Sequence, residues 1–256
     1  YTAPSDEALI YDIQTMKNLG FNMIRKHVKV ETARWYYHCD RLGMIVWQDM
    51  VNGGTYNAPF MTWLPALFPK FKLHTSDRIH PLFGRKNVHG REEFIRECKE
   101  TVTALKAFPC ISTWVIFNEG WGQFDSKKLT ALFRELDDTR LIDSASGWFD
   151  RRQGDFKSEH NYFAKQFVTP SDRAFVISEY GGYTCQVKGH TCSGKTYGYK
   201  ICSSPEEFQA AYHKLMSEEI EPLKEQGLCG AVYTQLSDIE DEINGLMTYD
   251  REVCKL

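Results

Sequence analysis

Residues 114–119 read WVIFNE, an apolar run that ends in an amide and a carboxylate. Consecutive bulky apolar residues such as these are typical of a strand that is buried on both faces of a parallel sheet. A carboxylate at the end of such a strand lies in desolvated surroundings, which costs free energy unless the charge is paired, hydrogen-bonded or used in chemistry. Glu119 is therefore either a helix cap or surface acid that follows a core strand, or a catalytic group.

Strand-like and helical segments alternate along the rest of the chain. Strands are expected at residues 21–25, 44–47, 111–117, 141–142, around 160–162, at 174–178 and at 230–234, and helices at 6–19, 33–42, 91–107, 125–136 and 205–226. This alternation predicts a parallel sheet, and the number of units favours a (β/α)8 TIM barrel over an open sheet. Only seven strands are found and the chain opens on a helix, so we expect the first barrel strand to be missing at the N-terminus of this fragment.

Length, charge and hydropathy restrict the class of protein. No repeat or linker divides the 256 residues, which we interpret as a single catalytic domain. No apolar stretch reaches the roughly 20 residues needed to span a bilayer, so no membrane segment is expected. The net charge of -3 gives no electrostatic reason to expect nucleic acid or anionic lipid as a partner. A neutral substrate suits this balance better.

The chain contains eight cysteines, most of them scattered among apolar neighbours as buried free thiols often are. A zinc site formed by Cys185, Cys192, Cys202 and His190 is an alternative, but the paired C-x-x-C spacing of a typical zinc site is absent. We therefore expect no metal and no cofactor. Free thiols favour a reducing compartment such as the cytoplasm, although the sequence does not identify the compartment.

A second predicted strand also ends in a glutamate. Residues 175–183 read FVISEYGGY, and Glu179 follows Glu119 by 60 positions, 179 minus 119. That separation leaves room for two further strand-helix units, so in a barrel the two strands face each other across the mouth where active sites lie. Paired carboxyl groups are what glycoside hydrolysis requires. The structural alternative is that both glutamates are members of ion pairs.

With these residues in place, the sequence resembles the catalytic barrel of family 2 glycoside hydrolases, which comprise β-galactosidases, β-glucuronidases and β-mannosidases. The resemblance covers nearly the whole chain and rests on three ordered segments. They are residues 22–25 with Asp40, Gly43 and 44–47; Pro109, Ile111, Trp114, Asn118 and Glu119; and residues 178–182. Three matches in order are much more specific than any one of them.

The resemblance implies a role for each matching residue. Glu119 would be the acid/base and Glu179 the nucleophile of a retaining double displacement. Asn118 would bind the sugar 2-hydroxyl, and Tyr162 would hydrogen-bond the nucleophile. Tyr233 falls where many relatives have the tryptophan on which the sugar rests. The remaining expected substrate-binding residues are Arg25, Asp49, His160 and Trp121.

Departures from the family pattern bear on the substrate. The histidine of the first segment is displaced by one position to His27. Glucuronidases of the family carry an Asn-x-Lys that grips the sugar carboxylate, and residues 238–245 contain no lysine. Their acidic side chains, at positions 238, 240, 241 and 242, would repel a uronate. The resemblance thus favours a neutral hexoside, and a β-galactoside above all.

Other interpretations stay open on sequence grounds. These are a β-glucuronidase or β-mannosidase of the same family, a carbohydrate-binding barrel without turnover, and a metal-dependent hydrolase using His190 and its neighbouring cysteines. Relatives place β-sandwich domains before the barrel, so a longer multidomain protein is expected; a homo-oligomer is also an open expectation. The irregular segment 51–87 reads as a functional loop. Aromatic residues expected to be able to stack on sugar are Tyr56, Phe60, Trp63, Trp121 and Trp148.

Overall fold

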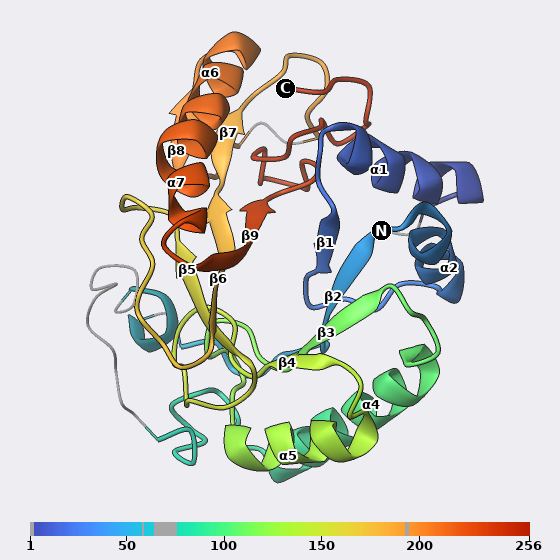
Figure 1. Ribbon diagram of the computed structural model, residues 1–256, viewed down its shortest axis with the longest axis vertical. Coiled ribbons are helices and arrows are strands. Elements are labelled where there is room, and N and C mark those ends of the chain that lie inside the picture. The colour runs from blue at the N-terminus through green and yellow to red at the C-terminus, as the bar shows by residue number, and fades with distance from the viewer. Residues whose placement is uncertain (1–2, 58, 64–75, 193–194) are drawn as a thin grey trace. The chain divides into compact units, whose positions relative to one another are not determined.

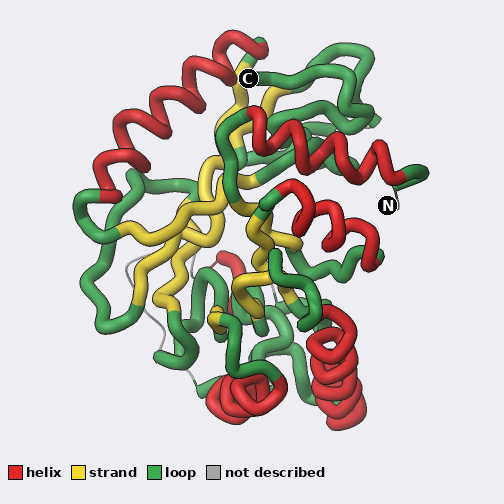
Figure 2. Tube along the Cα trace, turned by 45° about the vertical axis from the view of Figure 1, so that its right-hand side comes forward, coloured by secondary structure: helices red, strands yellow, loops and turns green. Residues whose placement is uncertain are grey.

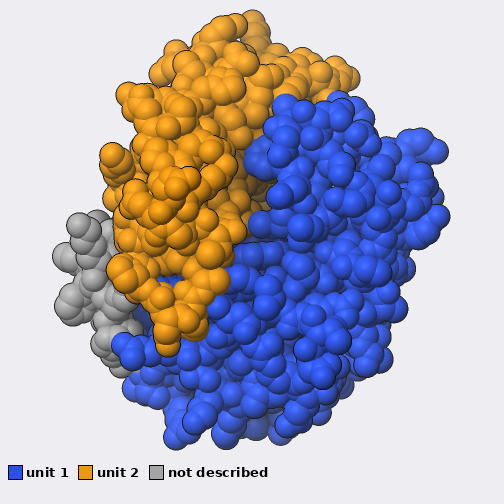
Figure 3. Space-filling model, in the orientation of Figure 1, with its two compact units in different colours: residues 1–158 blue, residues 159–256 orange. Residues whose placement is uncertain are grey.

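The computed structural model describes residues 3–57, 59–63, 76–192 and 195–256. The chain divides into two compact units, residues 1–158 and residues 159–256, which are coloured blue and orange in Figure 3. Each unit has a sheet containing parallel strands and helices packed beside it. In the part of the chain described, no helix is long and apolar enough to cross a membrane.

A parallel four-stranded sheet forms the centre of the first unit. Its order is β1–β2–β3–β4, with β1 at Met23–Lys26, β2 at Ile45–Asp49, β3 at Ile111–Val115 and β4 at Leu141–Asp143. The helices are α1 (Asp6–Asn18), α2 (Ala33–Leu42), α4 (Val88–Leu105) and α5 (Ser126–Leu136). In Figure 1 they lie along one side of this sheet, α1 against α2 and α4 against α5.

Local chemistry explains where these helices begin and end. The Ser5 side chain accepts a hydrogen bond from the Ala8 amide at 3.3 Å and caps α1, and Asn87 caps α4 through the Gly90 amide at 3.2 Å. Gly43 ends α2 in the left-handed conformation that glycine adopts most readily. Helix α1 begins at the expected residue, whereas α4 begins three residues before its expected start at 91 and ends two residues before its expected end at 107.

The two faces of the first sheet differ in chemistry. Trp114 of β3 donates its indole N–H to Asp137 Oδ2, just beyond α5, at 3.0 Å, so it lies on the helix side. Side chains alternate along a strand, which places the next residue, Val115, on the opposite face. The register aligns Val115 with Asp49 and with Asp143. Two carboxylates therefore share the face away from the helices.

The second unit contains a sheet of order β5–β6–β9, in which β6 and β9 are parallel. Strands are drawn in yellow in Figure 2. The bounds are Phe156–Asn161 for β5, whose first residues belong to the first unit, Ala174–Gly181 for β6 and Leu228–Thr234 for β9. A small parallel pair, β7 (Tyr183–Cys185) and β8 (Lys200–Cys202), follows β6. The helical segment between β8 and β9 consists of α6 (Pro205–Leu215), the π-helix η2 (Met216–Ile220) and α7 (Glu221–Lys224).

The α/β pattern predicted from the sequence is confirmed, with three differences besides the shifted ends of α4. The pair β7–β8 was not expected. The predicted helix at 205–226 is interrupted by η2, which precedes Pro222, a residue without the amide hydrogen that a regular helix requires. Within the irregular segment 51–87, a π-helix η1 spans Pro59–Trp63. The side chain of Trp63, one of the aromatic candidates, lies outside the described part.

Candidate active site

Glu119 follows β3 in an uncommon backbone conformation. Its φ angle is +52°, in the left-handed region that non-glycine residues rarely occupy and that is often found at functional sites. The Glu119 amide donates to the Ser146 carbonyl at 3.0 Å, which fixes the turn. Burial raises the pKa of Glu119 to about 7, against the opposing effects of His27 and Arg25. The carboxyl group is thus able to hold a proton near neutral pH.

Arg25 joins Asp49 and Asn118 in one hydrogen-bonded group beside Glu119. Its guanidinium binds both carboxylate oxygens of Asp49, at 2.9 and 2.8 Å, and donates to Asn118 Oδ1 at 2.8 Å. Burial alone would raise the pKa of Asp49, but Arg25 and His27 outweigh it and hold that pKa below its ordinary value. Because Arg25 occupies the amide oxygen of Asn118, the amide nitrogen is the group that can donate to a ligand.

His27 belongs to the edge of this group. Its Nδ1 lies 3.5 Å from Asp49 Oδ2, while about half of its side chain is exposed. The displaced histidine of the sequence pattern thus contacts the Arg25–Asp49 pair.

Asp143 is a further member of this region that sequence reasoning missed. It ends β4, is buried to 1% exposure, and its Oδ2 has no hydrogen-bond partner among the described residues. Burial raises the pKa of Asp143 to about 7, although a hydrogen bond from Ser158 and the charge of Arg25 lower it. The signal that could have identified Asp143 is the one that identified Glu119, a carboxylate directly after an apolar run. In β4 that run consists of only two residues, Leu141 and Ile142.

Trp121 is directed toward the segment 52–56. Its indole N–H donates to the Gly54 carbonyl at 3.2 Å, and its ring meets the exposed Tyr56 edge to face at 5.7 Å. Phe60 and Trp148, by contrast, pack against a buried cluster of Met61, Phe83 and Phe149. Of the aromatic residues singled out in the sequence and described here, Tyr56 and Trp121 are the exposed ones.

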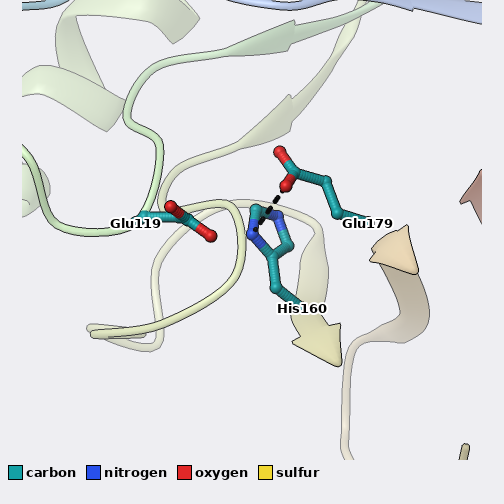
Figure 4. A group of neighbouring side chains, drawn as sticks. All are labelled: Glu119, His160 and Glu179. Atoms are coloured by element: carbon teal, nitrogen blue, oxygen red, sulfur yellow. Dashed lines mark ion pairs between the residues drawn. The ribbon is translucent and has the colours of Figure 1, made fainter. Parts of the chain in front are cut away.

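The second unit builds its own polar group around Glu179 on β6. Tyr162 donates its hydroxyl to Glu179 Oε2 at 2.6 Å, and His160 Nδ1 lies 3.4 Å from the same oxygen. Figure 4 shows His160 directed at Glu179, with the dashed line marking their ion pair; Glu119 is labelled in the same view. Thr234 Oγ1, at the end of β9, is 3.0 Å from the Tyr162 hydroxyl. These contacts hold the Glu179 carboxylate in one orientation.

Tyr233 does not join the Glu179 group, contrary to the expected role as a sugar platform. It is buried, with its ring edge to face against Tyr180 at 5.6 Å and against Tyr212 of α6 at 5.2 Å. Its strand neighbour Thr234 points the other way, to Tyr162, as alternation along a strand requires. Tyr233 is therefore a packing residue between the sheet and α6.

The proposed zinc ligands are also separated. Cys185 and Cys202 are buried register partners in β7 and β8, and Cys192 is exposed. His190 pairs instead with Asp250, its Nδ1 lying 2.8 Å from Asp250 Oδ2. Among the described residues, the group around His190 that could hold a metal ion comprises Asp250 and Glu252 and none of the cysteines.

Comparisons with known proteins identify the family. The profile of "Glycosyl hydrolases family 2, TIM barrel domain" matches residues 3–254. A β-galactosidase of Priestia megaterium (strain DSM 319 / IMG 1521) is 24% identical over 213 residues, which is 75% of this chain and 17% of the relative. A β-galactosidase of Streptococcus thermophilus is 24% identical over 144 residues, 54% of this chain and 12% of the relative. The chain thus spans less than a fifth of the length of either relative.

Solved structures give the same fold. An FMN-binding β-glucuronidase from Facaelibacterium prausnitzii L2-6 superposes with a TM-score of 0.68 at 21% identity, covering 98% of this chain and 39% of that chain. A β-galacturonidase from Eisenbergiella tayi bound to galacturonate gives a TM-score of 0.68 at 16% identity, covering 98% and 46%. At such identities the likeness concerns the fold alone. Together with the profile match, it shows that this chain belongs to glycosyl hydrolase family 2 and is its TIM barrel domain.

Proposed function

We propose that this domain is the catalytic part of a retaining glycosidase that cleaves terminal β-linked neutral hexosides, β-galactosides above all. Glu179 is the nucleophile and Glu119 the acid/base. The observation that carries the proposal is the contrast between the two carboxyl groups. Burial raises the pKa of Glu119 to about 7, whereas Glu179 receives the Tyr162 hydroxyl and lies beside His160. Two carboxyl groups in such different surroundings suit the two roles of this chemistry.

In the first step a Glu179 oxygen forms a bond to the anomeric carbon while the glycosidic bond breaks. Glu119 gives its proton to the departing oxygen, so that the leaving group departs as an alcohol. In the second step a water molecule, deprotonated by Glu119, attacks the anomeric carbon and releases Glu179. The sugar keeps its β configuration because the carbon is inverted twice.

The Arg25–Asp49–Asn118 group supplies the substrate contacts of the first unit in this proposal. Arg25 fixes the Asn118 amide so that its nitrogen is presented as a donor, and the bidentate pair with Asp49 fixes Arg25. A donor held in place before the substrate binds can strengthen its contact with the 2-hydroxyl as charge develops on the sugar.

Charge favours a neutral sugar. The segment after β9 carries Glu240, Asp241 and Glu242, and the nearby Lys255 is buried in an ion pair with Asp238 at 2.7 Å. A uronate would find acidic side chains there and no available lysine. Two curated relatives are named β-galactosidase, which supports the same choice, while the solved neighbours named for uronides are more distant in sequence.

The test is hydrolysis of nitrophenyl β-galactoside, β-glucuronide, β-mannoside and β-glucoside by the full-length protein and its Glu179→Gln variant. We expect turnover of the galactoside and loss of nearly all activity in the variant. The matched control is Glu218→Gln, an exposed glutamate on η2, which should leave turnover unchanged.

A second measurement tests the stereochemistry. Proton NMR during hydrolysis should show the β-anomer as the first product. Release of the α-anomer, or full activity in Glu179→Gln, would reject the mechanism; preferential glucuronide or mannoside turnover would reject the substrate. Absence of turnover by a folded protein that still binds galactose would favour a carbohydrate-binding barrel. We also propose that residues 1–256 act as one catalytic domain within a longer protein that carries β-sandwich domains before it.

A further inference from the structure

The Tyr162 ring that reaches Glu179 is stacked on a second tyrosine. Tyr199, in the segment before β8, lies parallel to Tyr162, with ring centroids 3.9 Å apart and an interplanar angle of 11°. The Phe163 ring meets the Tyr199 ring edge to face, with centroids 5.0 Å apart. Nothing in the sequence pattern assigns a role to Tyr199, and its ring covers the side chain that orients the proposed nucleophile.

Backbone contacts hold Tyr199 against the end of β6. Its amide donates to the Gly182 carbonyl at 3.1 Å, while the Gly182 amide donates to the Thr234 carbonyl at 2.9 Å. Two residues earlier, the Tyr197 carbonyl accepts the Thr184 hydroxyl at 3.1 Å. The Tyr199 ring is therefore attached to the same strand end that carries Glu179.

Gly181 and Gly182 follow Glu179 and Tyr180, and aromatic rings occupy the space that a side chain at either position would need. A Cβ on Gly182 would lie 2.4 Å from Tyr199 Cδ2 and 3.3 Å from Tyr162 Cδ1. A Cβ on Gly181 would lie 2.3 Å from Cε2 of Tyr233, on the opposite side of the sheet. Both glycines also have positive φ angles, +87° at Gly181 and +64° at Gly182. Gly182 thus leaves room for the Tyr162–Tyr199 stack to lie against the backbone.

We propose that Tyr199 is a positioning residue for the reaction, acting through Tyr162 on Glu179. This inference rests on the proposed function. A tyrosine side chain has two rotatable bonds, and a parallel ring at van der Waals distance blocks rotation of Tyr162 out of the plane in which its hydroxyl meets Glu179 Oε2. Thr234 Oγ1 holds the same hydroxyl from β9. Removing the Tyr199 ring frees Tyr162 to leave the carboxylate.

A double-mutant cycle tests this coupling. Tyr199→Ala should lower kcat/KM about 10- to 100-fold, the rate equivalent of losing one hydrogen bond to a charged group. Tyr199→Phe keeps the ring and should restore nearly the full rate. In the Tyr162→Phe background, which lacks the hydroxyl, Tyr199→Ala should cost little more, because both changes remove the same contact. Tyr249→Ala, which removes an exposed aromatic elsewhere in this unit, is the control and should be neutral.

Independent effects of the two substitutions, or equal losses in Tyr199→Phe and Tyr199→Ala, would overturn the proposal. Tyr199→Leu, which fills space without a flat ring, replaces the alanine variant if that one fails to fold and should show an intermediate loss.

A readout without turnover separates this inference from the proposed function. In protein labelled with ¹³C at the tyrosine Cζ, the Tyr162 signal is identified by its disappearance in Tyr162→Phe. The change in its position between the parent and Glu179→Ala reports the contact of the hydroxyl with the carboxylate, and the comparison cancels the direct effect of the neighbouring ring. This change should vanish in the Tyr199→Ala background and persist in the Tyr199→Phe background. Its persistence in Tyr199→Ala refutes the positioning role even in an inactive protein, whereas its loss there, with no turnover by the parent, refutes the proposed function alone.

Discussion

At the scale of single residues, carboxylates at strand ends differ in what surrounds them. Asp49 is paired with Arg25 and Glu179 receives a tyrosine hydroxyl. Glu119 is half-buried and Asp143 is buried, and desolvation raises the pKa of each to about 7. The sequence pattern predicts Asp49, Glu119 and Glu179 as polar ends of apolar strands and misses Asp143, and it cannot distinguish the protonation states of these carboxyl groups. Those depend on burial and on partners that are distant in sequence.

The raised pKa of Glu119 leads to a pH dependence. In the proposed mechanism Glu119 donates a proton to the leaving group, and this proton is lost as the pH rises through about 7. We therefore expect kcat/KM for a β-galactoside to fall on the alkaline side with a midpoint near pH 7. The measurement is a pH-rate profile between pH 4 and pH 9.

In Glu119→Gln that alkaline limb should disappear. Its rate should fall about 100- to 10,000-fold for substrates with poor leaving groups and much less for nitrophenyl substrates, whose leaving groups need little protonation. An unchanged alkaline limb in this variant would assign the limb to another group.

Asp143 allows a prediction about stability. Burial raises the pKa of Asp143 from 3.8 to about 7 in the folded protein. The protonated side chain therefore contributes fully to the free energy of unfolding below the unfolded pKa, and this contribution is lost as the pH rises toward 7. Asp143→Asn removes this loss, so the variant should gain stability over the parent between pH 4 and pH 7, by on the order of 2–4 kcal/mol at the upper end. Urea denaturation at pH 4, 5.5 and 7 measures the difference, and a gain of the same size at every pH would contradict it.

Contacts between side chains from separate segments are what sequence reasoning could not provide for the site. The stack of Tyr162 on Tyr199 depends on how two loops approach each other, and no periodicity encodes it. Tyr233 was misassigned because one position along a strand reverses the side chain, and Thr234 is the residue directed at Tyr162.

At the scale of elements, prediction succeeded where capping and periodicity agree. The bounds of α2 match the expected residues 33–42, since Gly43 supplies an unambiguous end. The three-residue strands β7 and β8 were missed because so short a run shows no alternation. The break in the helix at 205–226 has a visible cause in Pro222, which the expected helix ignored.

The segment that follows β9 is fixed by a buried ion pair. Lys255 donates to Asp238 Oδ1 at 2.7 Å and to the Ile243 carbonyl at 3.1 Å, and Asp238 also accepts the Gly245 amide at 2.8 Å. Both side chains are almost fully buried. Lys255→Met would leave the Asp238 charge buried and unpaired, so we expect a loss of about 3–5 kcal/mol in the free energy of unfolding.

Chemical denaturation of Lys255→Met and of a matched control measures this loss. The control is Lys214→Met on α6, whose exposed side chain pairs with Glu218 at 3.9 Å and should contribute less than about 1 kcal/mol. The double variant Lys255→Met with Asp238→Asn should recover part of the stability, because no charge is left buried. Equal effects of the two lysine substitutions would show that the buried pair stabilises little.

At the scale of the whole molecule, the eight cysteines provide a test of the burial pattern. All are free thiols in the structure; five are buried and Cys192, Cys229 and Cys254 are exposed. Ellman's reagent should therefore react quickly with Cys192, Cys229 and Cys254 of the native protein and with all eight of these thiols after denaturation. Fast reaction of any of the five buried thiols, identified by peptide mass spectrometry, would show that the interior is more open than described.

The fold class was predictable because its signal is distributed over the whole chain. Seven expected strands correspond to β1 to β6 and β9, and the family match confirms the TIM barrel. The substrate stays a prediction, because preference among sugars depends on a few side chains in irregular segments, where no regular pattern fixes their positions.

The turn after Glu119 is attached to both ends of the irregular segment 51–87. Trp121 Nε1 binds the Gly54 carbonyl, the Gly122 amide binds the Phe83 carbonyl at 2.9 Å, and Arg85 reaches the Gly122 carbonyl at 3.0 Å. For protein engineering, these hydrogen bonds limit where a grafted loop can be joined to the chain. Donor loops from other family members should leave Gly54, Phe83 and Arg85 in place, because a swap that removes either attachment would disturb the turn that follows Glu119.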